Sequence, residues 1–76
     1  MKNPRAATAA LTSIRDGVMA IEQFPLSGRP LPDNPVNVRE WLVLYGSGGY
    51  RIRYRIDGDA ITVLAIRHTR EAGFQQ

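Results

Sequence analysis

The sequence has no cysteine and a single histidine, His68, and these shortages exclude several kinds of site. Without cysteine the chain can form neither a disulfide framework nor a thiolate metal site, and one histidine cannot build a multi-ligand centre. We therefore expect no bound metal and no cofactor. A secreted domain of this size would often need disulfides, so the composition favours a reducing cytoplasm.

Long apolar runs are also missing. No stretch is long enough to span a bilayer, and the first residues carry Lys2 and Arg5 without the apolar core of a signal peptide. We expect a cytoplasmic chain that has no membrane partner. Its 76 residues allow at most one domain, 1–76, which buries only about 60% of the surface that the unfolded chain exposes.

Lysine is nearly absent, because nine of the ten basic residues are arginine and Lys2 is the exception. Ten basic residues oppose seven acidic ones, for a net charge of +3. The planar guanidinium group suits bidentate contact with carboxylates and phosphates. The balance favours an acidic partner, either a nucleic acid or an acidic protein segment, and does not choose between them.

The first expected element is a helix over residues 3–24. Asn3 can cap it, Pro4 suits its first turn, and Pro25 stops it. Gly17 is a weak position that costs up to about 1 kcal/mol relative to alanine. The apolar residues recur on one face of an amphipathic helix, and they are Ala7, Ala10, Leu11, Ile14, Val18 and Ile21.

After a proline-rich connector, the pattern predicts strands at 38–45, 50–56 and 60–67. The glycine-rich loop "GSGG" joins the first pair, and Asp57-Gly58 between apolar runs is a strong hairpin signal for the second. The predicted class is α+β, with one amphipathic helix packed on a three-stranded antiparallel meander.

The predicted sheet has more apolar surface than one helix can cover. In the first strand, Trp41 and Val43 point one way, whereas Leu42 and Leu44 point the other. Exposed apolar patches of this kind mark interaction surfaces. Another chain, or another part of this one, should therefore cover the second face.

The stretch "YRIRYRI" alternates apolar and basic residues without a break, and it places three arginines on the face opposite Tyr50 and Ile52. They form either a solvated outer face or a basic binding platform. The candidate binding residues are Arg51, Arg53, Arg55, Arg67 and Arg70.

The register of the second hairpin decides which residues join that platform. A two-residue loop at Asp57-Gly58 pairs the three arginines with the third strand, in the order Arg55 with Ala60, Arg53 with Thr62 and Arg51 with Leu64. A three-residue loop would instead place Arg67 on the arginine face. The sequence alone leaves both registers open.

Few residues could carry catalysis. His68, in "RHTRE", could act as a general acid or base, or it could cap the edge of the sheet. No nucleophile motif is present, and the glycines of "GSGGY" are followed by no helix, which argues against a phosphate loop.

Two segments resemble a known family. "GYRIRYRIDGDAITVLAIRHTREAGF" is similar to the C-terminal half of RelE/ParE-superfamily toxins, and "KNPRAATAALTSIRDGVMAIEQFPLSGRP" is similar to their second helix and the connector after it. The specific parts are the G-Y-R-x-x-Y-R segment and the closing R-H-x-R-E-A-G-[YF]. The resemblance implies the toxic half of a type II toxin–antitoxin, or plasmid stabilisation, module with a cognate antitoxin.

The resemblance also implies that a strand and a first helix usually precede the segment with which this chain begins. We expect the chain to fill that gap by self-association or by binding its antitoxin. The uncovered face of the sheet agrees with this expectation.

The superfamily divides by target. RelE-like members cleave mRNA on the ribosome, and Arg51 and Arg70 match positions of their catalytic arginines. Leu42 and Leu44 stand near the places where those enzymes carry lysines, and Phe74 lacks the hydroxyl of their C-terminal tyrosine.

An RNase needs proton-transfer groups that arginine cannot easily supply. This favours the ParE-like members, which resemble the RelE-like ones in fold but inhibit DNA gyrase. By that resemblance we expect a non-enzymatic inhibitor of gyrase. The alternatives are a RelE-like ribosome-dependent endonuclease and an inactive remnant that binds only an antitoxin or itself. The endonuclease would use Arg51, His68, Arg70 and Glu71.

Overall fold

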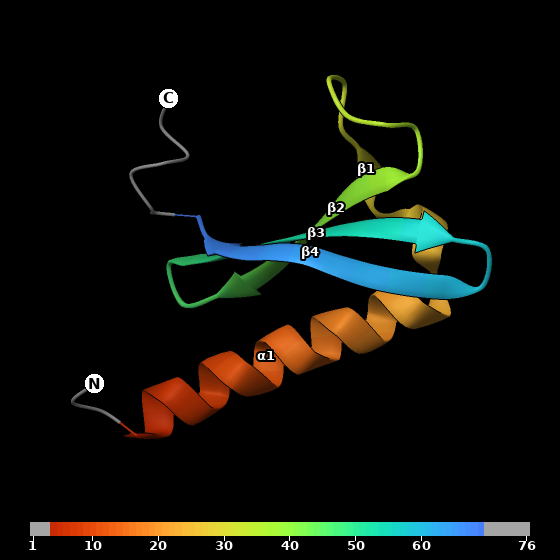
Figure 1. Ribbon diagram of the computed structural model, residues 1–76. Helices are drawn as coiled ribbons and strands as arrows, with labels where there is room; N and C mark the ends of the chain where they lie inside the picture. Colours follow the sequence, from red (N-terminus) through yellow and green to blue (C-terminus); the bar gives the residue numbers. More distant parts are fainter. Residues whose placement is uncertain (1–3, 70–76) are drawn as a thin grey trace.

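The computed structural model describes residues 4–69, and its sheet is an antiparallel meander in the order β1-β2-β3-β4 (Figure 1). The α+β class is confirmed, although the sheet has four strands and not three. No helix in the described range is long and apolar enough to cross a membrane. The elements are α1 (Pro4–Gln23), η1 (Pro25–Ser27), β1 (Arg29–Pro30), β2 (Val38–Tyr45), β3 (Gly48–Asp57) and β4 (Ala60–His68).

The helix α1 lies along one face of the sheet, as Figure 1 shows. Its apolar stripe supplies Ile21, which is fully buried, and Ile14 and Val18, which pack against the core. Phe24 leaves the helical conformation, with φ −134° and ψ 71°, and Pro25 then prevents further α-helix. The helix therefore turns its apolar stripe toward β2 and β3.

Gly17 has a packing role that the sequence does not reveal. A Cβ atom at this position would lie 2.5 Å from Val43 Cγ2 and 3.1 Å from Ile52 Cδ1. The absent side chain lets the helix approach the sheet closely at its middle. The cost in helix propensity is thus offset by tighter packing.

The fourth strand, β1, lies in the proline-rich connector, where the sequence pattern predicts no strand. Arg29 pairs with Glu40 and Pro30 with Arg39. The strand is only two residues long and contains a proline, so it carries no alternating pattern that would predict it. Its pairing places Arg29 beside the middle of β2.

The first loop of the meander is tighter than predicted, and the second has two residues but begins one residue later. The turn between β2 and β3 is Gly46-Ser47, with Gly46 at φ 62°, and the other two glycines of "GSGG" belong to β3. The turn between β3 and β4 is Gly58-Asp59, with Gly58 at φ 60°. Positive φ at these positions favours glycine.

The predicted Asp57-Gly58 loop is wrong, because Asp57 pairs with Ala60 inside the ladder. Farther along the hairpin the register shifts between Arg53 and Tyr54, which leaves Leu64 opposite no residue of β3. The pairs are Asp57 with Ala60, Arg55 with Thr62, Arg53 with Ala65 and Arg51 with Arg67. The predicted set of pairs is wrong, whereas Arg67 does lie on the arginine face, where the alternative register placed it.

The core lies between α1 and the sheet. Its fully buried side chains are Ile21, Ile52 and Tyr54, and Val43 is 8% exposed. Burying these apolar groups is the main favourable contribution to folding in a chain of this size.

Tyr54 also attaches the connector to the core. Its hydroxyl donates to the Pro25 carbonyl at 2.5 Å and accepts from the Gly28 amide at 3.0 Å. Arg39 Nη1 donates to the carbonyl oxygens of Gly28 at 2.7 Å and Leu26 at 3.2 Å. Burial raises the pKa of Tyr54 above its usual value, against smaller opposing effects of the Gly28 amide and the Arg39 charge.

Candidate functional site

The face of the sheet opposite α1 carries the arginines of β3. We call it the arginine face and define it by Arg51, Arg53, Arg55 and Arg67. The register places Arg51 between Leu42 of β2 and Arg67 of β4, so these side chains share one side of the sheet. Like charges directly opposite each other are unfavourable, so the pair of Arg51 and Arg67 favours an anion nearby.

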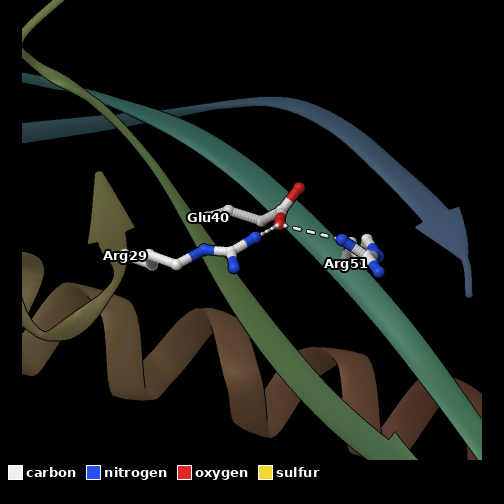
Figure 2. Close-up of polar contacts among 3 residues, drawn as sticks. All are labelled: Arg29, Glu40 and Arg51. Atoms are coloured by element: carbon white, nitrogen blue, oxygen red, sulfur yellow. Dashed lines mark hydrogen bonds and ion pairs between the residues drawn. The ribbon is translucent and has the colours of Figure 1, made fainter. Parts of the chain in front are cut away.

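Glu40 supplies such an anion at the centre of the face. It is 8% exposed, and it lies between Arg29 of β1 and Arg53 of β3 in the register. Its Oε1 accepts from Arg29 Nη2 at 3.0 Å and from Arg51 Nη1 at 3.3 Å, as Figure 2 shows. Two charge-assisted hydrogen bonds compensate for removing the carboxylate from water.

We call Arg29, Glu40 and Arg51 the ionic cluster. Sequence reasoning singled out Arg51 alone and missed the other two. The available signal was a glutamate inside the apolar strand "VREWLVLY", where a buried charge needs a partner. Arg29 could not have been found in this way, because only the pairing of β1 with β2 brings it there.

The remaining arginines of the face differ in their surroundings. Arg55 Nε forms an ion pair with Asp57 Oδ2 at 2.7 Å, and both side chains are nearly half exposed, at 42% and 46%. Such surface pairs contribute little to stability. Arg53 Nε is buried and has no hydrogen-bond partner among the described residues. Arg67 is exposed, and Arg70 and Glu71 lie outside the described residues.

A depression of about 410 Å³ adjoins the ionic cluster. β1 pairs with β2 only at Arg39 and Glu40, so Trp41 and Leu42 of β2 have no neighbouring strand on that side and line the depression. The guanidinium groups of Arg29 and Arg51 therefore lie beside apolar side chains there. The depression is lined by Ser27, Arg29, Glu40, Trp41, Leu42 and Arg51.

The apolar part of this side of the sheet is exposed. Leu42 is 54% exposed and Leu44 is 77% exposed, and the residue between them, Val43, is buried on the opposite face of β2. No helix within residues 4–69 covers them, in agreement with the prediction that the single helix leaves one face open.

His68 lies on the other face. It pairs with Tyr50, whose ring it meets edge to face, with centroids 5.1 Å apart and an interplanar angle of 86°. Successive residues of a strand point to opposite faces, so His68 and Arg67 point apart. The structure therefore does not bring His68 and Arg51 to a common site. Residues 4–69 also contain no cluster of three acidic or histidine side chains that could hold a metal ion.

A protein-family model matches nearly the whole chain. The model for the ParE toxin of the type II toxin–antitoxin system, parDE, matches residues 1–73. The chain belongs to this family. No curated protein and no solved structure matches it. As a ParE-family member the chain is a toxin of a type II toxin–antitoxin system, and this membership implies an antitoxin as partner.

Proposed function

We propose that this ParE-family toxin acts in the cytoplasm as a single domain, by binding a protein target and not by catalysis. By analogy the target is DNA gyrase, and a cognate antitoxin neutralises the toxin. The observation that carries the proposal is the family match over residues 1–73. An exposed face that combines arginines with leucines supports a protein partner, because such a surface offers both ion pairs and apolar contact.

The geometry argues against the endonuclease alternative. That alternative needs an acid and a base on either side of one phosphate. His68, the candidate acid or base, lies on the face opposite Arg51. One observation favours the alternative: the Glu40 carboxylate lies next to Arg51, the candidate phosphate-binding cation. We therefore keep the endonuclease as the second candidate.

Two assays with purified protein separate these candidates. We expect inhibition of gyrase supercoiling and intact mRNA on programmed ribosomes. The Arg51→Ala variant should lose the inhibition, whereas Arg55→Ala, which removes the same charge from a solvent-exposed pair on the same face, should keep it. Cleavage of ribosome-bound mRNA would instead support the endonuclease. Inactivity in both assays would leave a remnant that binds only its antitoxin or itself.

Self-association is the second part of the proposal. Without an antitoxin, a second copy of the chain would cover Leu42 and Leu44, and the antitoxin would displace it. Sedimentation equilibrium should show a dimer that Leu44→Glu converts to a monomer. A wild-type chain that stays monomeric and cooperatively folded at high concentration would contradict this part.

A further inference from the structure

The ionic cluster and the exposed leucines are adjacent on one face, although they offer different chemistry. Arg29 is 69% exposed and Arg51 is 39% exposed, so both guanidinium groups can reach an incoming anion while they contact Glu40. Leu42 lines the same depression. A ligand that occupies this place meets two cations and an apolar wall together.

Several arginines gather close to Glu40. Arg29 and Arg53 flank it in the register, and Arg51 contacts it from the diagonal position on β3. Cations gathered around one anion raise the local positive potential. The buried Nε of Arg53 adds a donor that has no hydrogen-bond partner among the described residues. The cluster is therefore suited to a second anion.

The apolar wall distinguishes between the two kinds of anionic partner. A phosphodiester backbone would make charge contacts here but would bury no apolar group against Leu42 and Leu44. A protein segment that carries both carboxylates and apolar side chains would use both halves of the surface. The position of Glu40 also shows that the arginines accept a carboxylate at this point.

We propose that the ionic cluster and the adjoining depression form a docking site for an acidic protein segment whose apolar side chains contact Leu42 and Leu44. Glu40 is the internal competitor of that segment. It occupies hydrogen-bond donors of Arg29 and Arg51 in the free protein and so weakens the binding of other carboxylates. This inference rests on the proposed function, since it describes how the toxin recognises the antitoxin that its family implies.

The test uses a synthetic peptide of about ten residues that alternates glutamate with leucine, a length typical of a long strand. Calorimetric titration should show that it binds more tightly than two probes of the same length, a glutamate–serine peptide and a single-stranded RNA. Arg51→Ala should lower the affinity for the glutamate–leucine peptide about tenfold, as expected for one lost charge-assisted contact. Arg55→Ala is the matched control, because Arg55 lies on the same face about 13 Å farther along β3.

The competitor role has a test of its own. Glu40→Gln removes the charge and keeps the shape, and we expect it to bind the glutamate–leucine peptide about threefold more tightly. Asp57→Asn changes the net charge equally, yet it acts on the exposed pair with Arg55 and should leave the affinity nearly unchanged. Equal gains in both variants would mean that only net charge matters and would overturn the competitor role.

Other results would overturn the docking site itself. Equal losses of peptide affinity in Arg51→Ala and Arg55→Ala would indicate non-specific electrostatic attraction. Tighter binding of RNA than of the peptide would indicate a nucleic-acid surface. Circular dichroism of each variant checks that it is folded. These outcomes are separate from the proposed function, since gyrase inhibition is measured without the peptide. A toxin that inhibits gyrase but ignores the peptide would overturn this inference alone.

Discussion

The two faces of the sheet are built from alternate residues of the same strands, yet they differ in almost every physical respect. Toward α1, Ile52 and Tyr54 are fully buried and Val43 nearly so. On the arginine face, Leu44 is 77% exposed, and a network of charges surrounds Glu40. The comparison indicates that the helix-covered face provides most of the stability, which leaves the arginine face available for binding.

The largest effect should come from the centre of the covered face. Ile52→Ala removes a fully buried side chain and leaves a cavity between the helix and the sheet. We expect a loss of about 2–5 kcal/mol in the free energy of unfolding, measured by urea denaturation. Leu44→Ala is the control on the other face and should change stability by less than about 0.5 kcal/mol. Equal losses for the two variants would refute the division of roles.

The close contact at Gly17 gives a second comparison. Gly17→Ala adds a methyl group only 2.5 Å from Val43 Cγ2, so we expect a loss of about 1–3 kcal/mol despite the better helix propensity of alanine. Leu44→Phe adds more volume on the open face and should be nearly neutral. Combining Gly17→Ala with Val43→Ala should recover part of the loss, and strict additivity of the two changes would exclude the contact as its cause.

Glu40 sharpens the comparison, because it is a charged residue that is buried on the open face. Glu40→Ala should cost about 1–2 kcal/mol, since Arg29 and Arg51 lose a shared partner but remain partly hydrated. Asp57→Ala breaks an exposed pair and should cost less than about 0.5 kcal/mol. Thermal and urea unfolding of both variants measures the difference. If Glu40→Ala lowers the free energy of unfolding no more than Asp57→Ala does, Glu40 has no structural role.

The smallest effect concerns the polar contact of the covered face. Tyr54→Phe should cost about 1 kcal/mol near neutral pH, because the hydroxyl no longer connects Pro25 and Gly28. The raised pKa of Tyr54 also predicts a pH dependence. Above about pH 10 the unfolded chain loses the phenol proton while the native chain retains it, so stability falls as the pH rises.

The loss of stability at alkaline pH tests the ionisation of the Tyr54 phenol separately from its hydrogen bonds. Urea midpoints of the wild type and of Tyr54→Phe should converge as the pH rises through the folded-state pKa of Tyr54. A constant difference between the two proteins across this range would show that burial of the phenol does not couple to folding.

Much of the local structure could be predicted from local patterns. The repeat of apolar residues marked α1, and the range 38–45 coincides with β2. The alternation of "YRIRYRI" separated Ile52 and Tyr54 from the arginines, because side chains in a strand alternate whatever the strand pairs with.

The site itself depended on pairing between distant residues, which only the tertiary structure decides. The bulge opposite Arg53 and Tyr54 changes which residues of β4 pair with Arg51 and Arg53, and no local sequence signal predicts the bulge. The connector strand brought Arg29 to Glu40 from eleven residues away. The sequence by itself therefore determined which residues within β2, and which within β3, lie on the same face, since that follows from backbone geometry. Which residues of different strands contact each other was decided by the strand register, and the register depends on the packing and hydrogen bonding of the whole sheet.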